Sequence, residues 1–192
     1  MTYFHVSRNA RPLVVAGAPA IRVLTVGALV TPNGPATLSV TGMAVANGER
    51  TYLFWPQHYL SNGDVVTIRV LAEGVATPPS STTVEPELPV QEELARLRAG
   101  LEGNRHADPP SSPTSYSHTR APKSSAFTVT SSSGASVVAT LGHANLLQSV
   151  VTLRGGVCYL EVDSFLESSV DSKRWLSSTI EFNESTTIAY AT

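Results

Sequence analysis

The sequence predicts an all-β protein built from two tandem copies of a small antiparallel β-sandwich or barrel domain, joined by a linker with one short amphipathic helix. Three observations predict this fold: a residue pattern that occurs twice, short alternating segments separated by turn signals, and a Pro/Ser-rich stretch between the two copies. The predicted divisions are residues 1–74 for the first β-domain, 75–125 for the linker, and 126–192 for a second, diverged copy.

The repeated pattern includes the only two tryptophans of the chain, Trp55 and Trp175. Other residues recur at offsets of 123 positions early in the copies, 122 in the middle, and 120 from the tryptophans onward. The matched pairs are Phe4/Phe127, Val6/Val129, Val14/Val137, Val15/Val138, Ala16/Ala139, Leu38/Leu160, Val40/Val162, Leu60/Ile180, Asp64/Glu184, Thr67/Thr187 and Ile68/Ile188. The offset changes only where turns are expected, which favours an internal duplication. The competing explanation is the alternation that all half-buried strands share.

The first copy contains about six segments rich in β-branched or aromatic residues. Asn-Gly pairs at 33–34, 47–48 and 62–63 separate several of them, and this dipeptide is a strong hairpin signal because both residues accept positive φ angles. A further hairpin is expected around Arg8-Asn9-Ala10. The expected strands are Tyr3–Ser7, Pro12–Ala16, Ile21–Val30, Ala36–Ala44, Glu49–Trp55 and Val65–Leu71.

The second copy keeps the strand-like segments but has looser turns, at 155–156, 170–172 and 183–184. The charge of the two copies differs. Residues 1–84 carry five arginines and three acidic residues, whereas residues 124–192 carry three basic and six acidic residues, which gives +2 against −3. Opposite charges would help the two copies to face each other or different partners.

The linker contains one candidate helix, at about residues 89–102, between two Pro/Ser/Thr-rich stretches that are expected to be extended or mobile. Pro89 suits the first helical position and Gly103 suits a helix stop. Four apolar residues spaced by four, three and four positions form one stripe, which must bury either against a β-domain or against a partner helix. They are Val90, Leu94, Leu97 and Leu101.

No combination of residues indicates catalysis, and the expectation is a protein that is not an enzyme and has no cofactor and no metal site. The five histidines lack metal-ligand spacing, and no nucleophile elbow or phosphate-binding loop is present. His58 with Asp64 is the one acid–base pair that can be written, and an ordinary surface histidine is the favoured interpretation. Cys158 is the only cysteine, so it forms no disulfide within the chain, and a packed thiol is expected.

Aromatic residues cluster in the fifth expected strand. On alternate positions Tyr52 and Phe54 share one face of that strand. One face of the strand is expected to lie in the core, and the other to contact another protein or to pack against the linker helix. Nucleic acid is not an expected partner, because the chain has a net charge of −2 and few basic residues near these rings. No signal peptide or transmembrane segment is expected, so the predicted location is the cytoplasm or the inside of a virion or assembly.

One stretch within residues 8–72 carries Trp55-Pro56, then Leu60-x-x-Gly63-Asp64-x-Val66-Thr67-Ile68-Arg69; the second copy lacks the Pro and the Gly-Asp. This pattern resembles that of a family of small bacterial β-proteins of unassigned function. The resemblance implies a fold and no activity. The sequence therefore favours a non-catalytic protein-binding module of a bacterial system, either an adaptor or an immunity-type partner. Its expected partner is another protein or a second copy of the same chain in a homo-oligomer. The alternative is a structural component of a phage particle or secretion assembly.

Overall fold

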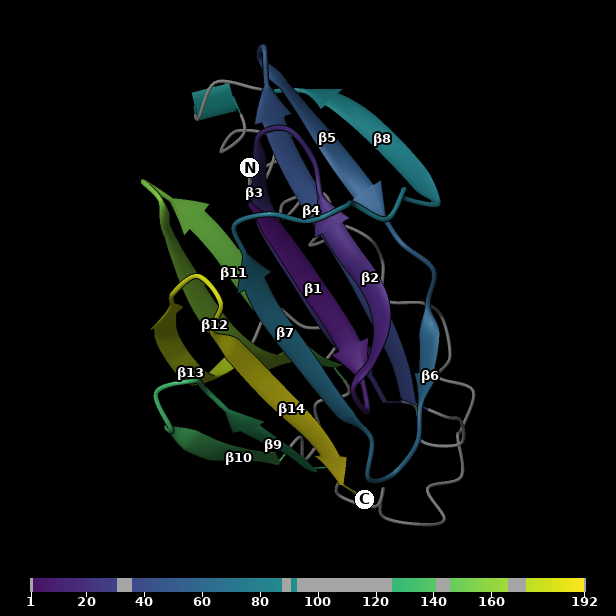
Figure 1. Cartoon of the computed structure of the whole chain (residues 1–192), viewed down its shortest axis with the longest axis vertical. Helices are drawn as coiled ribbons and strands as arrows, with labels where there is room; N and C mark the ends of the chain where they lie inside the picture. The colour runs from purple at the N-terminus through teal and green to yellow at the C-terminus, as the bar shows by residue number, and fades with distance from the viewer. Residues whose placement is uncertain are drawn as a thin grey trace, which may run out of the picture.

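The computed structural model describes residues 2–30, 36–87, 91–92, 126–140, 146–165 and 172–191, and its fourteen elements are all strands (Figure 1). They form two antiparallel sheets packed face to face, which confirms the all-β prediction. The sheets do not close on each other, so the fold is a sandwich and the barrel alternative is wrong. The predicted helix at 89–102 falls outside the described residues except for positions 91 and 92.

The strands follow one another along the chain with these bounds: β1 (Tyr3–Arg8), β2 (Arg11–Gly17), β3 (Ile21–Leu29), β4 (Ala36–Ala46), β5 (Glu49–Phe54), β6 (His58–Leu60), β7 (Val65–Leu71), β8 (Ser81–Pro86), β9 (Ala126–Thr130), β10 (Ser136–Thr140), β11 (Leu146–Arg154), β12 (Val157–Phe165), β13 (Ser172–Ile180) and β14 (Ser185–Ala191).

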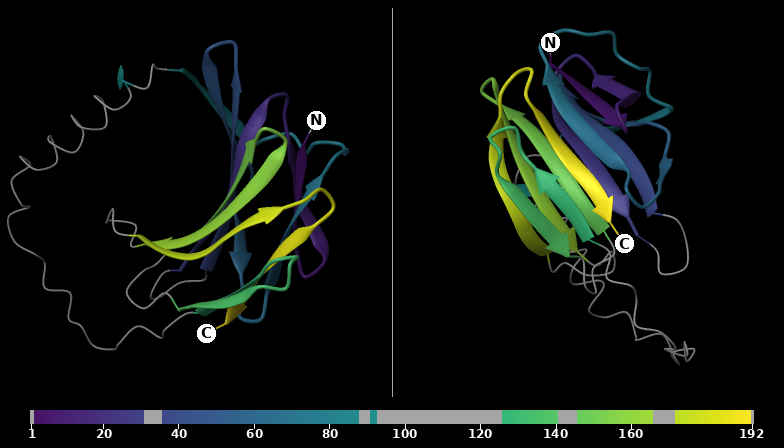
Figure 2. Two further views of the ribbon diagram at one scale, coloured as in Figure 1. Left: turned by 90° about the vertical axis from the view of Figure 1, so that its left-hand side faces the viewer. Right: turned by 60° about the horizontal axis from the view of Figure 1, so that its bottom comes forward.

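Each sheet contains strands from both ends of the chain. The six-stranded sheet has the order β10-β9-β14-β7-β1-β2, and the eight-stranded sheet has the order β13-β12-β11-β3-β4-β5-β8 with β6 also paired to β4. The ladders β7–β14 and β3–β11 join the two segments, one in each layer. In Figure 2 the green-to-yellow strands of the second segment lie against the purple-to-blue strands of the first. From these ladders outward, the order β7-β1-β2 corresponds to β14-β9-β10, and β3-β4-β5 corresponds to β11-β12-β13.

Local sequence explains the strands and most of their turns. Successive residues alternate between half-buried and buried from Tyr3 to Val6 in β1 and from Ala36 to Val45 in β4, as a strand with one face in a core requires. Asn47 and Gly48 have φ angles of 54° and 75° and join β4 to β5, as predicted. Gly63 also has a positive φ, of 86°, but its turn joins β6 to β7, which belong to different sheets. The hairpin predicted there is wrong because β6 pairs with β4.

Strand β8 lies within the segment predicted as a linker. Its residues, Ser81-Thr-Thr-Val-Glu-Pro86, pair along their whole length with β5. Serine, threonine and valine fit a strand, and a proline is tolerated because β8 is the last strand of the sheet. The Pro/Ser/Thr composition therefore corresponds here to an edge strand.

A single cluster of buried apolar residues fills the space between the sheets, and it draws on both segments of the chain. Phe4, Leu24, Phe127 and Leu160 are all fully buried. The predicted boundaries at 74 and 126 thus divide the chain into segments whose strands share two sheets and one core.

The two tryptophans differ in their burial and in their contacts. Trp55 is 4% exposed and donates a hydrogen bond of 2.9 Å from Nε1 to the carbonyl of Thr77. Thr77 in turn bonds to Val15 of β2 at 2.9 Å, so residues 72–80 cross over Trp55 from one sheet to the other. Trp175 is only partly buried, and the ammonium of Lys173 lies 3.7 Å from its ring centroid.

The core contains a hydroxyl that suggests a stabilising substitution. Thr186 of β14 is fully buried, and its Oγ1 has no hydrogen-bond partner among the described residues. A buried hydroxyl without a partner is destabilising, so Thr186→Val should raise the free energy of unfolding by about 1 kcal/mol. Chemical denaturation measures this change. Thr187→Val, one position along and half-exposed, is the control and should change stability much less. A loss of stability in Thr186→Val would contradict the account.

Candidate functional site

The predicted contact residues Tyr52 and Phe54 both lie on the outer face of the eight-stranded sheet. Between them Leu53 is buried in the core, so the strand alternates as expected. Phe54 is 38% exposed and Tyr52 is half-buried. Both rings therefore belong to a sheet face that no strand of the described part of the chain covers.

Strand register places Tyr52 in a line of apolar or aromatic side chains that crosses five strands, with Thr152 as the one exception. Residue pairs run from Tyr52 to Met43, from Met43 to Val23, from Val23 to Thr152, and from Thr152 to Tyr159. We call Tyr52, Met43, Val23, Thr152 and Tyr159 the Tyr52–Tyr159 row. Four inter-strand steps of about 4.8 Å make it about 19 Å wide.

The row has exposed apolar neighbours on both sides. Tyr159 itself is 43% exposed, and Val157, two residues before it on the same strand, is 42% exposed. At the other end Phe54 faces outward two residues from Tyr52. An apolar band of this extent on the outer face of a two-layer sandwich resembles the centre of a protein contact more than an ordinary solvated face.

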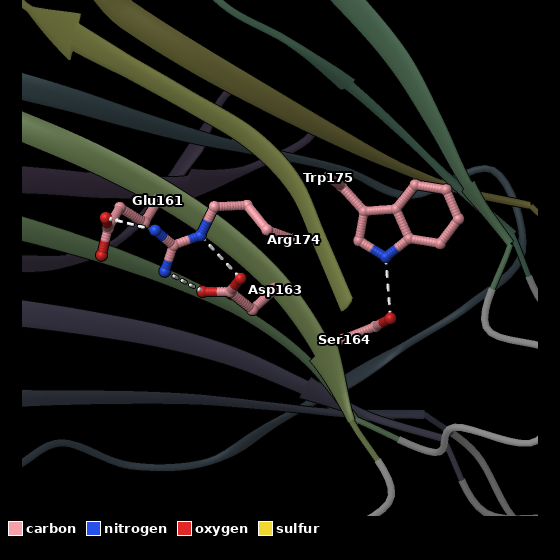
Figure 3. Close-up of polar contacts among 5 residues, drawn as sticks. All are labelled: Glu161, Asp163, Ser164, Arg174 and Trp175. Atoms are coloured by element: carbon pink, nitrogen blue, oxygen red, sulfur yellow. Dashed lines mark hydrogen bonds and ion pairs between the residues drawn. The ribbon is translucent and has the colours of Figure 1, made fainter. Parts of the chain in front are cut away.

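Charged residues border the row on β12 and β13 (Figure 3). The Arg174 guanidinium donates from Nε to Asp163 Oδ1 at 2.9 Å, from Nη2 to Asp163 Oδ2 at 3.1 Å, and from Nη1 to Glu161 Oε1 at 2.7 Å. These contacts, above all the hydrogen bonds to Asp163, raise the pKa of Arg174 above its already high value. Glu161 lies two residues from Tyr159, so the apolar row ends in a polar rim.

Trp175 lies at a β-bulge in β13, the strand at one edge of the eight-stranded sheet. The β12–β13 register shifts between Val162 and Asp163, where Leu176 and Arg174 are the respective partners, so Trp175 is the extra residue of a bulge. Its indole Nε1 donates to Ser164 Oγ at 2.7 Å, as Figure 3 shows. The bulge and this bond fix the direction of Arg174 on the outer face.

Asp64, which follows Gly63 in the quoted motif, has a structural role. Asp64 accepts a hydrogen bond of 2.8 Å from the backbone N–H of Ser61 and one of 2.6 Å from Asn9 Nδ2. The Ser61 N–H, and to a lesser degree Asn9 and Arg8, hold the pKa of Asp64 below its usual value against the opposing effect of burial. The carboxylate therefore ties the β6–β7 turn to the β1–β2 hairpin.

His58 and Asp64, the two groups that could be written as an acid–base pair, have different surroundings. Asp64 is engaged with Ser61 and Asn9, while the Nε2 of His58 is buried and has no hydrogen-bond partner in the described part of the chain. Cys158 is 2% exposed, and burial raises the pKa of its thiol, which keeps it protonated at neutral pH. The described residues contain no group of three or more His, Cys, Asp or Glu side chains that would hold a metal ion.

Sequence reasoning found only part of the site. Val90, Leu94, Leu97 and Leu101 lie outside the described residues, so the packing of their stripe stays a prediction. Val23, Met43 and Tyr159 were missed because they join Tyr52 only through the pairing of five strands. The apolar residues at outer positions of β3 and β4 are the one sequence signal that could have identified Val23 and Met43.

No protein-family model, curated protein or solved structure matches the chain. The resemblance to small bacterial β-proteins therefore rests on the quoted motif alone. Within the described ranges, no helix is long and apolar enough to cross a lipid bilayer.

The Asp64 contacts predict how stability depends on pH. Because the folded-state pKa of Asp64 is lowered, its contribution is present above the unfolded-state value near 4 and is lost as the pH falls through the folded-state value. Asp64→Asn should lower the free energy of unfolding at pH 7 by about 1 kcal/mol and flatten its decline in acid. Urea denaturation between pH 7 and pH 2 measures both effects. Equal acid dependence of the two proteins would show that Asp64 contributes nothing.

Proposed function

We propose that this chain is a non-catalytic protein-binding module of a bacterial system, either an adaptor or an immunity-type partner. The observation that carries the proposal is the Tyr52–Tyr159 row with its polar rim. Covering an exposed apolar side chain contributes about 1.5–3 kcal/mol when its burial is complete. Aromatic anchors surrounded by polar groups are also the residues that dominate measured protein interfaces. The bacterial setting is supported by the motif of residues 55–69.

The amphipathic stripe of the predicted helix supports the same function. Residue 87 leaves β8 with its N–H bonded to the carbonyl of Gly48, at the edge of the sheet that carries the row. The helix proposed at 89–102 would follow immediately. Its apolar side chains, on Val90, Leu94, Leu97 and Leu101, would bury either on a sheet of this chain or on a partner helix.

We further propose that the two β-segments arose by duplication. In support, turn contacts recur 120 positions apart. Gly63 N–H donates to the Tyr190 carbonyl at 2.9 Å, and Asn183 N–H donates to the Val70 carbonyl at 2.7 Å. The Ser61 N–H bond to Asp64, of 2.8 Å, is matched by a 2.9 Å bond from Glu181 N–H to Glu184.

The joining ladders fit a duplication as well. A two-fold axis between related halves would pair a residue with its own counterpart, and Thr67 does pair with Thr187. The residue before each tryptophan also has an equivalent ladder partner. Phe54, before Trp55, pairs with Thr41, and Arg174, before Trp175, pairs with Asp163. A chain that resembles a fused dimer has two related surfaces that can diverge, as the charges of +2 and −3 in the two copies suggest.

The second candidate function is a structural component of a phage particle or secretion assembly. Only two lysines occur in the chain, and the outer face of the six-stranded sheet carries Thr67, Thr130 and Thr187 side by side. Short hydroxyl side chains in a row on one sheet face suit tight packing between subunits. Such a component would also bind another protein, or further copies of itself, without catalysis.

The test is affinity purification of the full chain from a bacterial host, comparing wild type with a Phe54→Ser/Tyr159→Ser double variant. Removing two aromatic anchors should reduce the retained partner by at least about tenfold, since each is worth more than about 1 kcal/mol at an interface. Val138→Ser is the matched control, because Val138 is 57% exposed on the outer face of the other sheet. Analytical ultracentrifugation of the same samples distinguishes a heterologous partner from self-assembly.

Retention of the same partner by the double variant would contradict a contact through the row. A large self-assembly that survives the double variant but is lost in Val138→Ser would favour the structural-component function instead.

A further inference from the structure

A polar cleft lies between the β1–β2 hairpin and the β6–β7 turn. Its volume is about 400 Å³, and its lining residues are Arg8, Asn9, Arg11, Ser61 and Asp64. Asn9 and Ala10 form the hairpin turn with φ angles of 50° and 63°, which brings the two arginines to adjacent strands. The cleft is on the first segment of the chain, and its residues are distinct from the Tyr52–Tyr159 row.

The two arginines are directly opposite each other in the hairpin ladder. Like charges in this position destabilise a hairpin, so the fold does not require the pair. The second hairpin, β9–β10, makes the corresponding turn with Ser131-Ser-Ser-Gly-Ala135 and carries no cation there. Its Ser132 Oγ nevertheless bonds to Glu184 at 2.8 Å, as Asn9 bonds to Asp64. The turn contacts therefore form without arginine.

The acidic group in the cleft is already satisfied. Both oxygens of Asp64 accept hydrogen bonds, from Asn9 Nδ2 and from the Ser61 N–H. Arg8 donates from Nη1 to the carbonyl of Tyr59, and this nitrogen is 4.0 Å from Asp64 Oδ2. Arg11 is exposed and has no hydrogen-bond or ion-pair partner among the described residues. Two guanidinium groups against one carboxylate leave a net charge of +1 in the cleft.

We propose that this cleft binds an oxyanion group, a carboxylate or a phosphate, through the guanidinium of Arg11 with Arg8 beside it. A guanidinium presents parallel N–H donors that match two oxygens of either group. Arg8 is held in place by Tyr59 and Asp64, so part of the site is preorganised before the ligand arrives. Asp64 orients this arginine, so the cleft combines two guanidinium groups with one carboxylate.

The experiment is isothermal titration of the full chain with inorganic phosphate, with succinate, and with uncharged succinamide, at low ionic strength so that charge screening is weak. Saturable binding of at least one anion is expected, with none of succinamide. Arg11→Gln should weaken that binding by about tenfold, which corresponds to one lost charge-assisted hydrogen bond. Arg22→Gln, an exposed arginine of β3 outside the cleft, is the matched control and should bind as wild type does.

Thermal unfolding without ligand separates binding from folding. Arg11→Gln removes the like-charge pair, so its unfolding midpoint should equal or exceed that of wild type although its anion binding is about tenfold weaker. Arg11→Lys keeps the charge without the two parallel donors and should bind more weakly than wild type. Tighter phosphate binding identifies a phosphoryl ligand, and tighter succinate binding identifies a carboxylate. Absence of saturable binding, or equal losses in the Arg11 and Arg22 variants, would overturn the proposal.

Discussion

The structure depends on two strand pairings, β3 with β11 and β7 with β14. Without them each segment would expose two long strand edges and an apolar sheet face. With them, residues as distant as Val23 and Thr152 become neighbours, and each layer becomes one continuous sheet. Because the hydrogen bonds of a ladder also fix side-chain register, the same pairings determine which residues share the inner core and which share the outer face.

The two proposed surfaces relate to these pairings in different ways. The Tyr52–Tyr159 row crosses the β3–β11 ladder, so it exists only when both segments are folded together. The oxyanion cleft is formed by one hairpin and one turn of the first segment, and its turn contacts recur in the second segment without the arginines. The two segments thus share the same turn contacts, while the exposed side chains around those turns differ.

The sequence contained enough information for most strands of the first segment, but not for which strands pair across the fold. Alternation located β1 to β5 and β7, and Asn47-Gly48 identified a true hairpin, because these signals are local. Asn62-Gly63 led to a wrong hairpin prediction, because here the dipeptide lies in the turn that connects β6 in one sheet to β7 in the other. Strand β8 was hidden by a composition that also suits a linker. Tyr52 and Phe54 were selected as contact residues, but Val23, Met43 and Tyr159 were not, because no local signal specifies which strands are neighbours.

The most direct test is whether the two segments unfold together. Trp55→Phe leaves Trp175 as the only indole, and Trp175→Phe leaves Trp55, so each variant reports on one segment by fluorescence. Shared sheets and a shared core predict that, in either variant, the fluorescence transition in urea coincides with loss of far-ultraviolet circular dichroism from all strands. A fluorescence transition that precedes or follows the circular dichroism, with half of the β-signal lost in each step, would show two independent domains and would contradict the account.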